Sequence, residues 1–472
     1  MVFSSLIFLY AFLPLSLAVY ALCRSLRAKN ISLLVFSLIF YAWGEPVYVL
    51  LLMTMALFDW YFSLRIQRAR REEKNAKLWV ALACVVNLGL IGLFEYAGMV
   101  CSIFGDVPAF VQRIALPLGI SFYTFQLLSY VVDVYRGDAE AQDKYWHVLL
   151  YAALFHQCIA GPIVRYKTIA EELFHERDET VDRARGCTRF AVGLAKKTVL
   201  ANACGALADS LLLTDAAIGS ASQLADNLAA LSNKPALALW VGMIAYAFQI
   251  YFDFSAYSDM AIGLGGMFGF SFPENFNYPY MADSMNEFWR RWHMSLTRWF
   301  REYLYFPLGG SRTRNADGMV RNLLIVWLCT GIWHGANWTF VFWGLWNFLF
   351  VVLERVAGID QWPGAIWRHG YTLLTVLIGW VLFRSDDLYC FFEYMANLFC
   401  LNGNGVFSAE AFMLLRENWL WLAASVLACV SPEDRRRKLP GALYPAAMLA
   451  LLGVCVLYLV RGGYNPFIYF NF

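Results

Sequence analysis

The chain has 472 residues, of which 60% are hydrophobic and only 15% are charged, and its mean hydropathy is +0.51. Soluble domains are about 45–50% apolar and about 25% charged, so this balance excludes a soluble globular protein, a disordered chain and a disulfide scaffold. The net charge of +2 implies no bulk attraction to nucleic acid. We therefore expect an all-α polytopic membrane protein, embedded in a lipid bilayer, with room for roughly ten or more helices of about 20 residues.

Apolar segments follow one another along the whole chain. Several are shorter than the ~20 residues that cross a bilayer. Short segments predict broken or re-entrant helices, whose backbone is tolerated only where protein or water covers it. Neither an internal repeat nor a linker separates them, so we expect one membrane domain over residues 1–472. The segments lie near residues 4–23, 31–44, 47–64, 78–97, 114–134, 146–164, 186–213, 235–270, 321–334, 337–356, 371–384, 388–400, 418–430 and 441–460.

Basic residues set the expected orientation, because cytoplasmic loops carry an excess of Lys and Arg. Basic clusters lie in residues 65–77 and 435–438, whereas residues 198–233 contain no Lys or Arg. We expect both clusters in the cytoplasm and 198–233 outside. The first segment precedes its basic residues, unlike a secretory signal, so it is expected to be retained. Both termini are then expected on the extracytoplasmic side.

Two carboxylates interrupt segment 235–270, where ionisable groups are costly and indicate function or a buried partner. Asp253 and Asp259 are six residues apart and do not share a helical face, so each is expected to pair with a different neighbour, such as an Arg. Gly265 and Gly269 fit close packing between helices better than a dinucleotide fingerprint.

A segment from Asn286 to Tyr305 interleaves arginines with Trp and Tyr, and a Gly-rich loop follows it. Arginine forks bind phosphates bidentately, which favours a site for a phosphorylated donor. The alternative is an interfacial helix whose arginines meet lipid headgroups. The candidate binding residues are Arg290, Arg291, Arg298, Arg301 and Arg312.

His334 ends an apolar run between Gly331 and Gly335. Such glycines allow another backbone or a substrate to approach closely. A neutral imidazole, with an ordinary pKa of about 6.5, accepts a proton at cellular pH. Asn337 is near enough in sequence to orient the ring or to donate to a developing oxyanion. The alternative is a histidine hydrogen-bonded between helices.

These motifs resemble the membrane-bound O-acyltransferase (MBOAT) family, and within it the bacterial branch that serves alginate O-acetylation; the branch that transfers D-alanine to teichoic acid is more distant. The resemblance runs almost from end to end. Its pieces are MVFSS at the start, FYAWGEP at 40–46, LPLGISFYTFQLLSYVVDVYRG at 116–137, AGPIVRY at 160–166, YFDFSAYSDMAIGLG at 251–265, NEFWRRWHMSLTRWFREYLYFPLGGSR at 286–312, GIWHGANWTFVFWG at 331–344, GWVLFRS at 379–385 and NPFIYFNF at 465–472.

The resemblance implies a ring of tilted and broken transmembrane helices around a thinned centre with a cytoplasmic funnel. It implies that His334 is the catalytic base and that His293, in the WHxS segment, is the second signature histidine. The terminal FxYxxF pattern implies that Tyr469 carries the acyl group transiently. On composition alone, this tail is instead an aromatic anchor at the bilayer surface.

The implied activity is O-acyl transfer in the bacterial cytoplasmic membrane. Acetyl-CoA is the expected acyl-donor substrate, with neither a tightly bound cofactor nor a metal. A partner with a serine nucleophile is expected outside, and it would place the acetyl group on a polysaccharide such as alginate. The alternatives are D-alanyl or other acyl transfer to teichoic acid or peptidoglycan, a transporter, which usually shows a repeated half, and a structural assembly subunit.

Overall fold

The computed structural model describes residues 1–174, 182–212, 228–312, 316–401, 403–430 and 443–461. The regular elements among these residues are all helical, which confirms the all-α fold class. Seven helices are long and apolar enough to cross a bilayer, by length and composition. These candidate spans are Leu26–Gly44, Tyr48–Arg71, Lys77–Phe104, Ala236–Met267, Trp338–Ala357, Ala365–Arg384 and Leu443–Val460.

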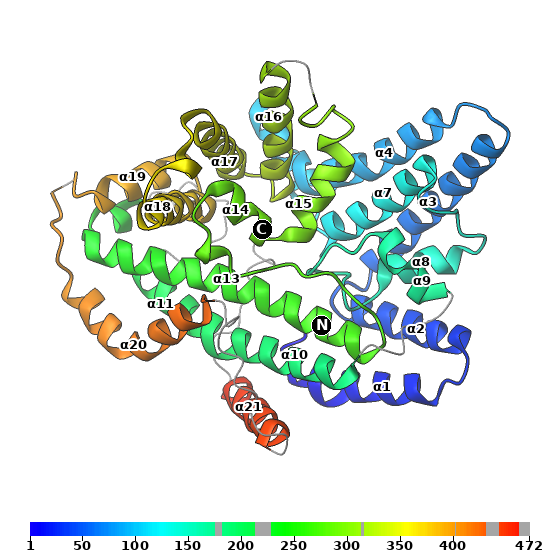
Figure 1. Cartoon of the computed structure of the whole chain (residues 1–472), viewed down its shortest axis with the longest axis horizontal. Helices are drawn as coiled ribbons and strands as arrows, with labels where there is room; N and C mark the ends of the chain where they lie inside the picture. The colour runs from blue at the N-terminus through cyan, green and yellow to red at the C-terminus, as the bar shows by residue number, and fades with distance from the viewer. Residues whose placement is uncertain (175–181, 213–227, 313–315, 402, 431–442, 462–472) are drawn as a thin grey trace. The chain divides into compact units, whose positions relative to one another are not determined.

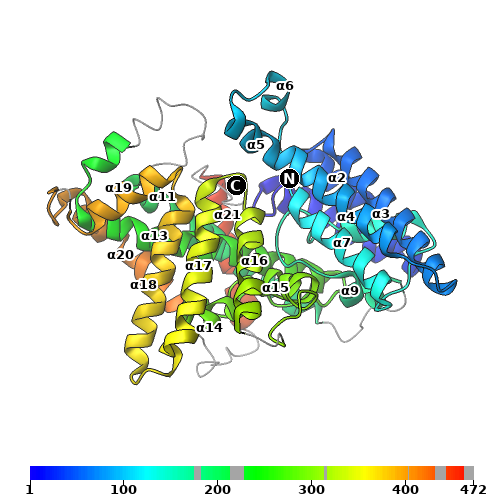
Figure 2. The same cartoon turned by 90° about the horizontal axis from the view of Figure 1, so that it is seen from above.

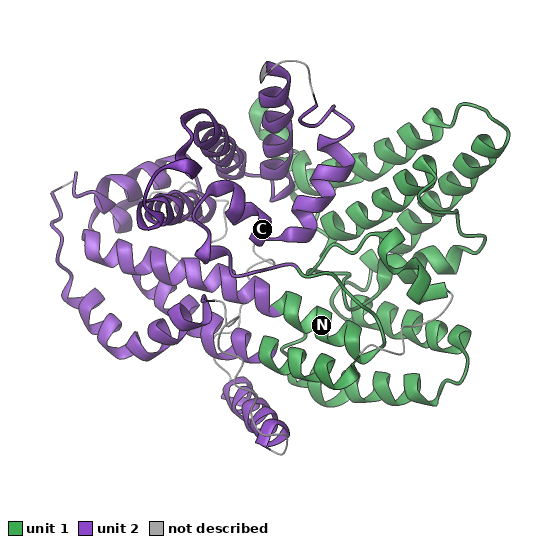
Figure 3. Ribbon diagram, viewed as in Figure 1, with its two compact units in different colours: residues 1–193, 257–274 green, residues 194–256, 275–472 purple. Residues whose placement is uncertain are grey.

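The chain divides into two compact units, which Figure 3 colours separately. Unit 1 comprises residues 1–193 and 257–274, and unit 2 comprises residues 194–256 and 275–472. The expected single domain over 1–472 stays a prediction. Each unit is described by itself below.

Unit 1 is built around α3, which packs against α4, α7 and α8 (Figure 1). Apolar residues occur on most sides of these helices, as expected of helices covered by protein or lipid. The elements of this unit are η1 (Phe8–Phe12), α1 (Leu13–Leu22), α2 (Leu26–Gly44), α3 (Tyr48–Arg71), α4 (Lys77–Ile91), η2 (Gly92–Tyr96), α5 (Ala97–Phe104), α6 (Ala109–Gln112), α7 (Ile120–Arg136), α8 (Tyr145–Ala153), α9 (Tyr166–Phe174) and most of α10 (Arg183–Ala195).

The predicted segment 146–164 is a broken one. Helix α8 ends at Ala153, and residues 154–164 continue without regular structure although all of them are buried. Irregular backbone at membrane depth is tolerated only inside protein or beside water. Burial within unit 1 meets that condition.

Close helix packing occurs in unit 1, but not at the two predicted glycines. A Cβ on Gly265 would lie 2.9 Å from the Phe272 ring, which belongs to the irregular segment after α13 and not to another helix. Gly269 lies beyond the end of α13 at a φ of 84°, where it terminates the helix; its expected packing role was wrong. The close approach instead joins α10 to α13. A Cβ on Gly186 would lie 2.8 Å from the Gly263 carbonyl oxygen, and one on Gly263 would lie 2.6 Å from the Phe190 nitrogen.

In unit 2, α16, α17 and α18 pack side by side in that order (Figure 2). Two short helices, α14 and α15, precede them in the chain and carry the arginine-rich segment. The elements of this unit are η3 (Lys196–Ala201), α11 (Asn202–Leu211), most of α13 (Ala236–Met267), η4 (Pro279–Met281), α14 (Met285–Arg291), α15 (Met294–Phe300), η5 (Arg301–Tyr305), α16 (Ala316–Trp333), α17 (Trp338–Ala357), η6 (Ile359–Gln361), α18 (Ala365–Arg384), α19 (Leu388–Leu398), α20 (Ala409–Ala428) and α21 (Leu443–Val460).

The two carboxylates of α13 have different partners, as predicted. In unit 2, Asp253 pairs with Lys197 at 2.6 Å, and both side chains are almost fully buried. In unit 1, Asp259 pairs with Arg189 at 2.9 Å, and Arg189 also contacts Glu274. Both carboxylates therefore have a cationic partner, which offsets the cost of burying their charge.

Candidate active site

Helices α16 and α17 form a hairpin that meets at two glycines. A Cβ on Gly331 would lie 2.4 Å from the Phe340 carbonyl oxygen, and one on Gly344 would lie 2.4 Å from the Trp327 carbonyl oxygen. Both distances are much shorter than a van der Waals contact. The two backbones can therefore come this close only because glycine has no Cβ at either position. The short turn at the end of this hairpin carries His334.

The His334 ring lies among aromatic side chains of three helices. Its centroid is 5.0 Å from Trp333, 4.9 Å from Trp343, 5.1 Å from Phe383 and 6.4 Å from Phe340. The residue is nevertheless only half-buried. It lies outside the seven candidate spans, and burial lowers its pKa below the ordinary value of 6.5. The imidazole is therefore neutral at cellular pH and can accept a proton.

Asn337 holds the other end of the turn. Its Oδ1 accepts a hydrogen bond of 3.0 Å from the Thr339 N–H, which caps the N-terminus of α17. Its Nδ2 donates to the Asp386 carbonyl oxygen at 2.8 Å. The side chain thus fixes the turn that carries His334, and its predicted role at an oxyanion stays a prediction.

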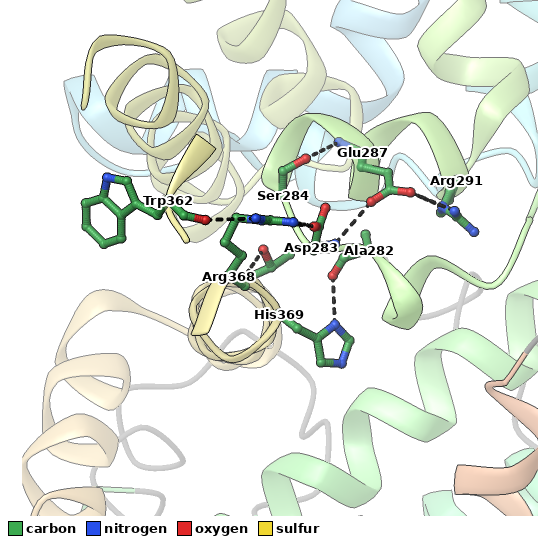
Figure 4. A network of polar contacts seen from close by, with 9 residues as sticks. Ala282, Asp283, Ser284, Glu287, Arg291, Trp362, Arg368 and His369 are labelled. Atoms are coloured by element: carbon green, nitrogen blue, oxygen red, sulfur yellow. Dashed lines mark hydrogen bonds and ion pairs between the residues drawn. The ribbon is translucent and has the colours of Figure 1, made fainter. Parts of the chain in front are cut away.

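The N-terminus of α14 is capped from two sides. Ser284 Oγ accepts from the Glu287 N–H at 3.1 Å (Figure 4). The buried carboxylate of Glu354, on α17, accepts from the Met285 N–H at 2.6 Å and from Nδ2 of Asn286 at 3.1 Å. A carboxylate at a helix N-terminus is stabilising because it meets both unpaired N–H groups and the positive end of the helix dipole. Glu354 therefore fixes α14 against α17.

The loop before α14 is also tied to α18, as Figure 4 shows. Arg368 donates from Nε to Asp283 at 3.0 Å and from Nη1 to the Trp362 carbonyl oxygen at 2.8 Å. Hydrogen bonds from Arg368 lower the pKa of Asp283. His369 donates from Nδ1 to the Ala282 carbonyl oxygen at 3.0 Å, since a carbonyl can only accept.

His293 is the residue between α14 and α15, and it is only 2% exposed. Its φ of 42° is in the left-handed region, which is uncommon for a residue with a side chain and is often found at functional sites. Its Nδ1 is 3.0 Å from Oδ1 of Asn275, and that oxygen also accepts from the N–H and the hydroxyl of Ser295. Burial lowers the pKa of His293 well below 6.5, and nearby His334 lowers it further.

Aromatic contacts connect the two histidines within unit 2. The Trp333 ring is 5.9 Å from His293 and 5.0 Å from His334. Trp289 of α14 is 5.5 Å from Trp343, which forms part of the wall around His334. The structure thus brings the two predicted histidines to opposite sides of one Trp333 contact, within the same unit.

The predicted arginine set divides into two kinds. Arg291 is already engaged: it donates from Nη2 to Glu287 at 2.6 Å (Figure 4). It also donates from Nη1 to the Asn277 carbonyl oxygen at 3.3 Å. The other four arginines form no ion pair with the part of the chain that the structure describes, so their guanidinium groups are available to an anion. They are Arg290, Arg298, Arg301 and Arg312.

Tyr469 lies outside the described residues. Sequence reasoning also missed two residues that hold the site. Asn275 contacts His293 from 18 positions earlier in the chain, and Glu354 caps a helix that begins 69 positions before it. No periodic pattern indicates such distant contacts.

Comparison with known proteins places these residues in a family. A model of the membrane-bound O-acyltransferase family matches residues 141–359. The probable alginate O-acetylase AlgI of Azotobacter vinelandii is 42% identical over 398 residues, which covers 82% of this chain and 76% of that protein. The peptidoglycan O-acetyltransferase of Helicobacter pylori is 31% identical, over 85% of this chain and 80% of that protein. The teichoic acid D-alanyltransferase of Streptococcus thermophilus is 26% identical, over 70% and 81% respectively.

Proposed function

Because this chain belongs to the membrane-bound O-acyltransferase family, we propose that it moves an acetyl group from cytoplasmic acetyl-CoA across the membrane, for O-acetylation of an extracytoplasmic polysaccharide such as alginate. The protein is a multi-pass bacterial membrane protein and an O-acyltransferase.

The observation that carries the proposal is the neutral, half-buried imidazole of His334 within its aromatic wall. A hydroxyl oxygen attacks the thioester carbonyl while His334 takes the hydroxyl proton. A C–O bond forms, the C–S bond breaks, and the proton passes to the departing CoA thiolate. Asn337 or a backbone N–H stabilises the oxyanion. The apolar wall excludes water, which strengthens these contacts and limits hydrolysis of the thioester.

The first acceptor hydroxyl is that of Tyr469. A free phenol has a pKa of about 10, so at neutral pH it needs a base to attack a thioester. The acetyl ester of Tyr469 then passes its acyl group to the serine of a secreted or anchored partner. In that second step one C–O bond forms and another breaks, and the phenol regains its proton. The partner places the acetyl group on the polysaccharide.

Four arginines support a phosphorylated donor on the cytoplasmic side. They lie on α14, α15, η5 and the loop that follows, and none is paired with a described carboxylate. CoA carries phosphates, which the forked guanidinium group of arginine binds through two hydrogen bonds. Lipid headgroups carry phosphates as well, so the donor role needs a test in which acetyl-CoA is varied. The residues are Arg290, Arg298, Arg301 and Arg312.

Substitution of His334 tests the proposal directly. We expect His334→Ala to insert normally and to lose acetyl transfer by about 10²–10⁴-fold, the usual contribution of a general base. The measurement is transfer of labelled acetyl from acetyl-CoA in membranes, with His147→Ala in unit 1 as a matched histidine control. Full transfer by a normally expressed His334→Ala protein contradicts the proposal.

Tyr469→Phe tests the carrier, because it removes only the phenolic oxygen. We expect normal insertion and no acetylated polysaccharide. In the wild type, with the downstream partner deleted, mass spectrometry of the C-terminal peptide should show an acetyl adduct. An active Tyr469→Phe enzyme would leave the tail as a membrane anchor and direct His334 to another hydroxyl.

The acceptor polymer has a second candidate. The Helicobacter pylori relative is a peptidoglycan O-acetyltransferase, so peptidoglycan is an alternative to alginate-like polysaccharides. Base-labile acetate measured separately on exopolysaccharide and on cell wall, with and without this protein, decides between the two polymers.

A further inference from the structure

The two ring nitrogens of His293 have different surroundings. Nε2 of His293 is buried and forms no hydrogen bond with any residue that the structure describes. The other ring nitrogen, Nδ1, is 3.0 Å from Oδ1 of Asn275. Buried polar atoms nearly always have a hydrogen-bond partner, so an exception needs an explanation. A substrate group that binds at this nitrogen provides one.

The contacts of Asn275 determine which ring nitrogen carries the proton. Its Oδ1 lies 3.2 Å from the backbone nitrogen of Ser295, and a backbone N–H can only donate. The Asn275 atom at this position is therefore the oxygen, which can only accept. His293 must then donate from Nδ1, and Nε2 carries the lone pair. Oγ of Ser295 is 3.5 Å from Nδ1, but its hydrogen is donated to Oδ1 of Asn275 at 2.8 Å, so this contact does not change the assignment.

The ring is held neutral by its surroundings. Its described ring neighbours are Phe254 at 4.7 Å, Phe276 at 6.4 Å and Trp333 at 5.9 Å, and none of them is charged. His334 is the titratable group that acts on it. A neutral ring with its proton fixed on Nδ1 presents a hydrogen-bond acceptor to the site, and not a donor.

We propose that Asn275 is a positioning residue that fixes this tautomer, and that Nε2 of His293 accepts a hydrogen bond from an amide N–H of the acyl donor's thioester arm. This rests on the proposed function, in which His334 takes the proton of the attacking hydroxyl. A hydroxyl has a single hydrogen, so His293 must receive its hydrogen bond from another group. In a CoA thioester, the amide two carbons from the sulfur is the nearest N–H. No covalent bond changes at His293.

The tautomer is tested without any activity assay. The protein contains 6 histidines, and ¹⁵N-histidine NMR in lipid nanodiscs separates protonated from unprotonated ring nitrogens. The His293 signals are assigned by their loss in His293→Ala. We expect Nδ1 to be protonated and Nε2 unprotonated at neutral pH. A proton on Nε2 overturns the proposal whether or not acetyl-CoA is the donor.

The donor contact is tested with two substrates. One is acetyl-CoA, and the other is an analogue in which an ester oxygen replaces the amide N–H nearest to the sulfur. The wild type should prefer acetyl-CoA by about tenfold in kcat/KM, the usual effect of one lost hydrogen bond to a buried group. His293→Ala should be slower with acetyl-CoA and lose the preference. Equal use of both substrates by an active wild type overturns this contact and leaves the proposed function intact.

Asn275→Asp tests the positioning role. The carboxylate still accepts from Ser295 and from Nδ1–H, so folding should be kept, but it favours the charged imidazolium and raises the pKa of His293. Below that pKa, Nε2 carries a proton and cannot accept. We expect Asn275→Asp to raise KM for acetyl-CoA at low pH and to recover as the pH rises, while the wild type changes little. A wild-type pH profile in Asn275→Asp overturns the role of Asn275.

Discussion

The close contact between α16 and α17 allows the proposed base, His334, to be displaced without a substitution at His334 itself. In Gly331→Ala, the new Cβ would lie 2.4 Å from the Phe340 carbonyl oxygen, whereas ordinary contact begins at 3.4 Å. The two helices must therefore separate by about 1 Å at a point three residues before His334. Overpacking of this kind costs about 1–3 kcal/mol of stability. A shift of about 1 Å in a catalytic group can reduce the rate by about 10²-fold.

The matched control is Gly370→Ala in α18, where a Cβ meets nothing within 4 Å. It should keep wild-type activity and be unchanged or slightly more stable, because alanine favours a helix. Both variants are measured by thermal unfolding in detergent and by acetyl transfer well below the unfolding temperature. Gly344→Ala, at 2.4 Å from the Trp327 carbonyl oxygen, should behave like Gly331→Ala. Wild-type stability and activity in Gly331→Ala would refute the packing argument.

The remaining predictions concern the donor site, the topology and a helix cap. Arg298→Gln should raise KM for acetyl-CoA. The Arg291 guanidinium already pairs with a carboxylate, so Arg291→Gln should mainly lower thermal stability; equal effects of the two variants on KM would contradict the division of the arginines into paired and unpaired ones. A cysteine at exposed Asn233 should be labelled from outside and one at exposed Lys74 only after permeabilisation, above the background of the parent's own cysteines; the reverse pattern would overturn the orientation. Glu354→Gln keeps the shape of the side chain but removes the charge at the α14 N-terminus, and it should lower the free energy of unfolding by about 1–3 kcal/mol in denaturation assays. An unchanged free energy of unfolding would show that the charge of this cap contributes nothing.

Hydropathy predicts the helices of this protein well because burial in lipid or protein dominates their energetics. Segment 235–270 is observed as α13, and segment 337–356 is observed as α17. Segment 146–164 shows the limit. Its apolar composition predicts burial correctly, but composition does not distinguish helical from irregular buried backbone beyond Ala153.

Some residues of the candidate site could also be predicted, from polarity and not from hydropathy. His334 and His293 are polar residues in apolar surroundings, which is a signal that a sequence carries. Asn337 also carried a readable signal, since an Asn directly before an apolar helix is typical of an N-terminal cap. Asn275 carried none, because its contact with His293 depends on the path of an irregular segment and on a left-handed residue.

Both histidines lie where a helix is interrupted: His293 between α14 and α15, and His334 between α16 and α17. An interrupted helix leaves N–H groups without partners, and in a site poor in water those groups must be satisfied by side chains. Asn275, Asn337 and Glu354 do this, and the first two act directly beside a histidine. The residues that satisfy these helix ends are thus also the ones that hold the segments carrying the two histidines. Alanine at these three positions, which removes the acceptor, should therefore change stability and activity together, whereas loss of an unpaired arginine should change activity alone.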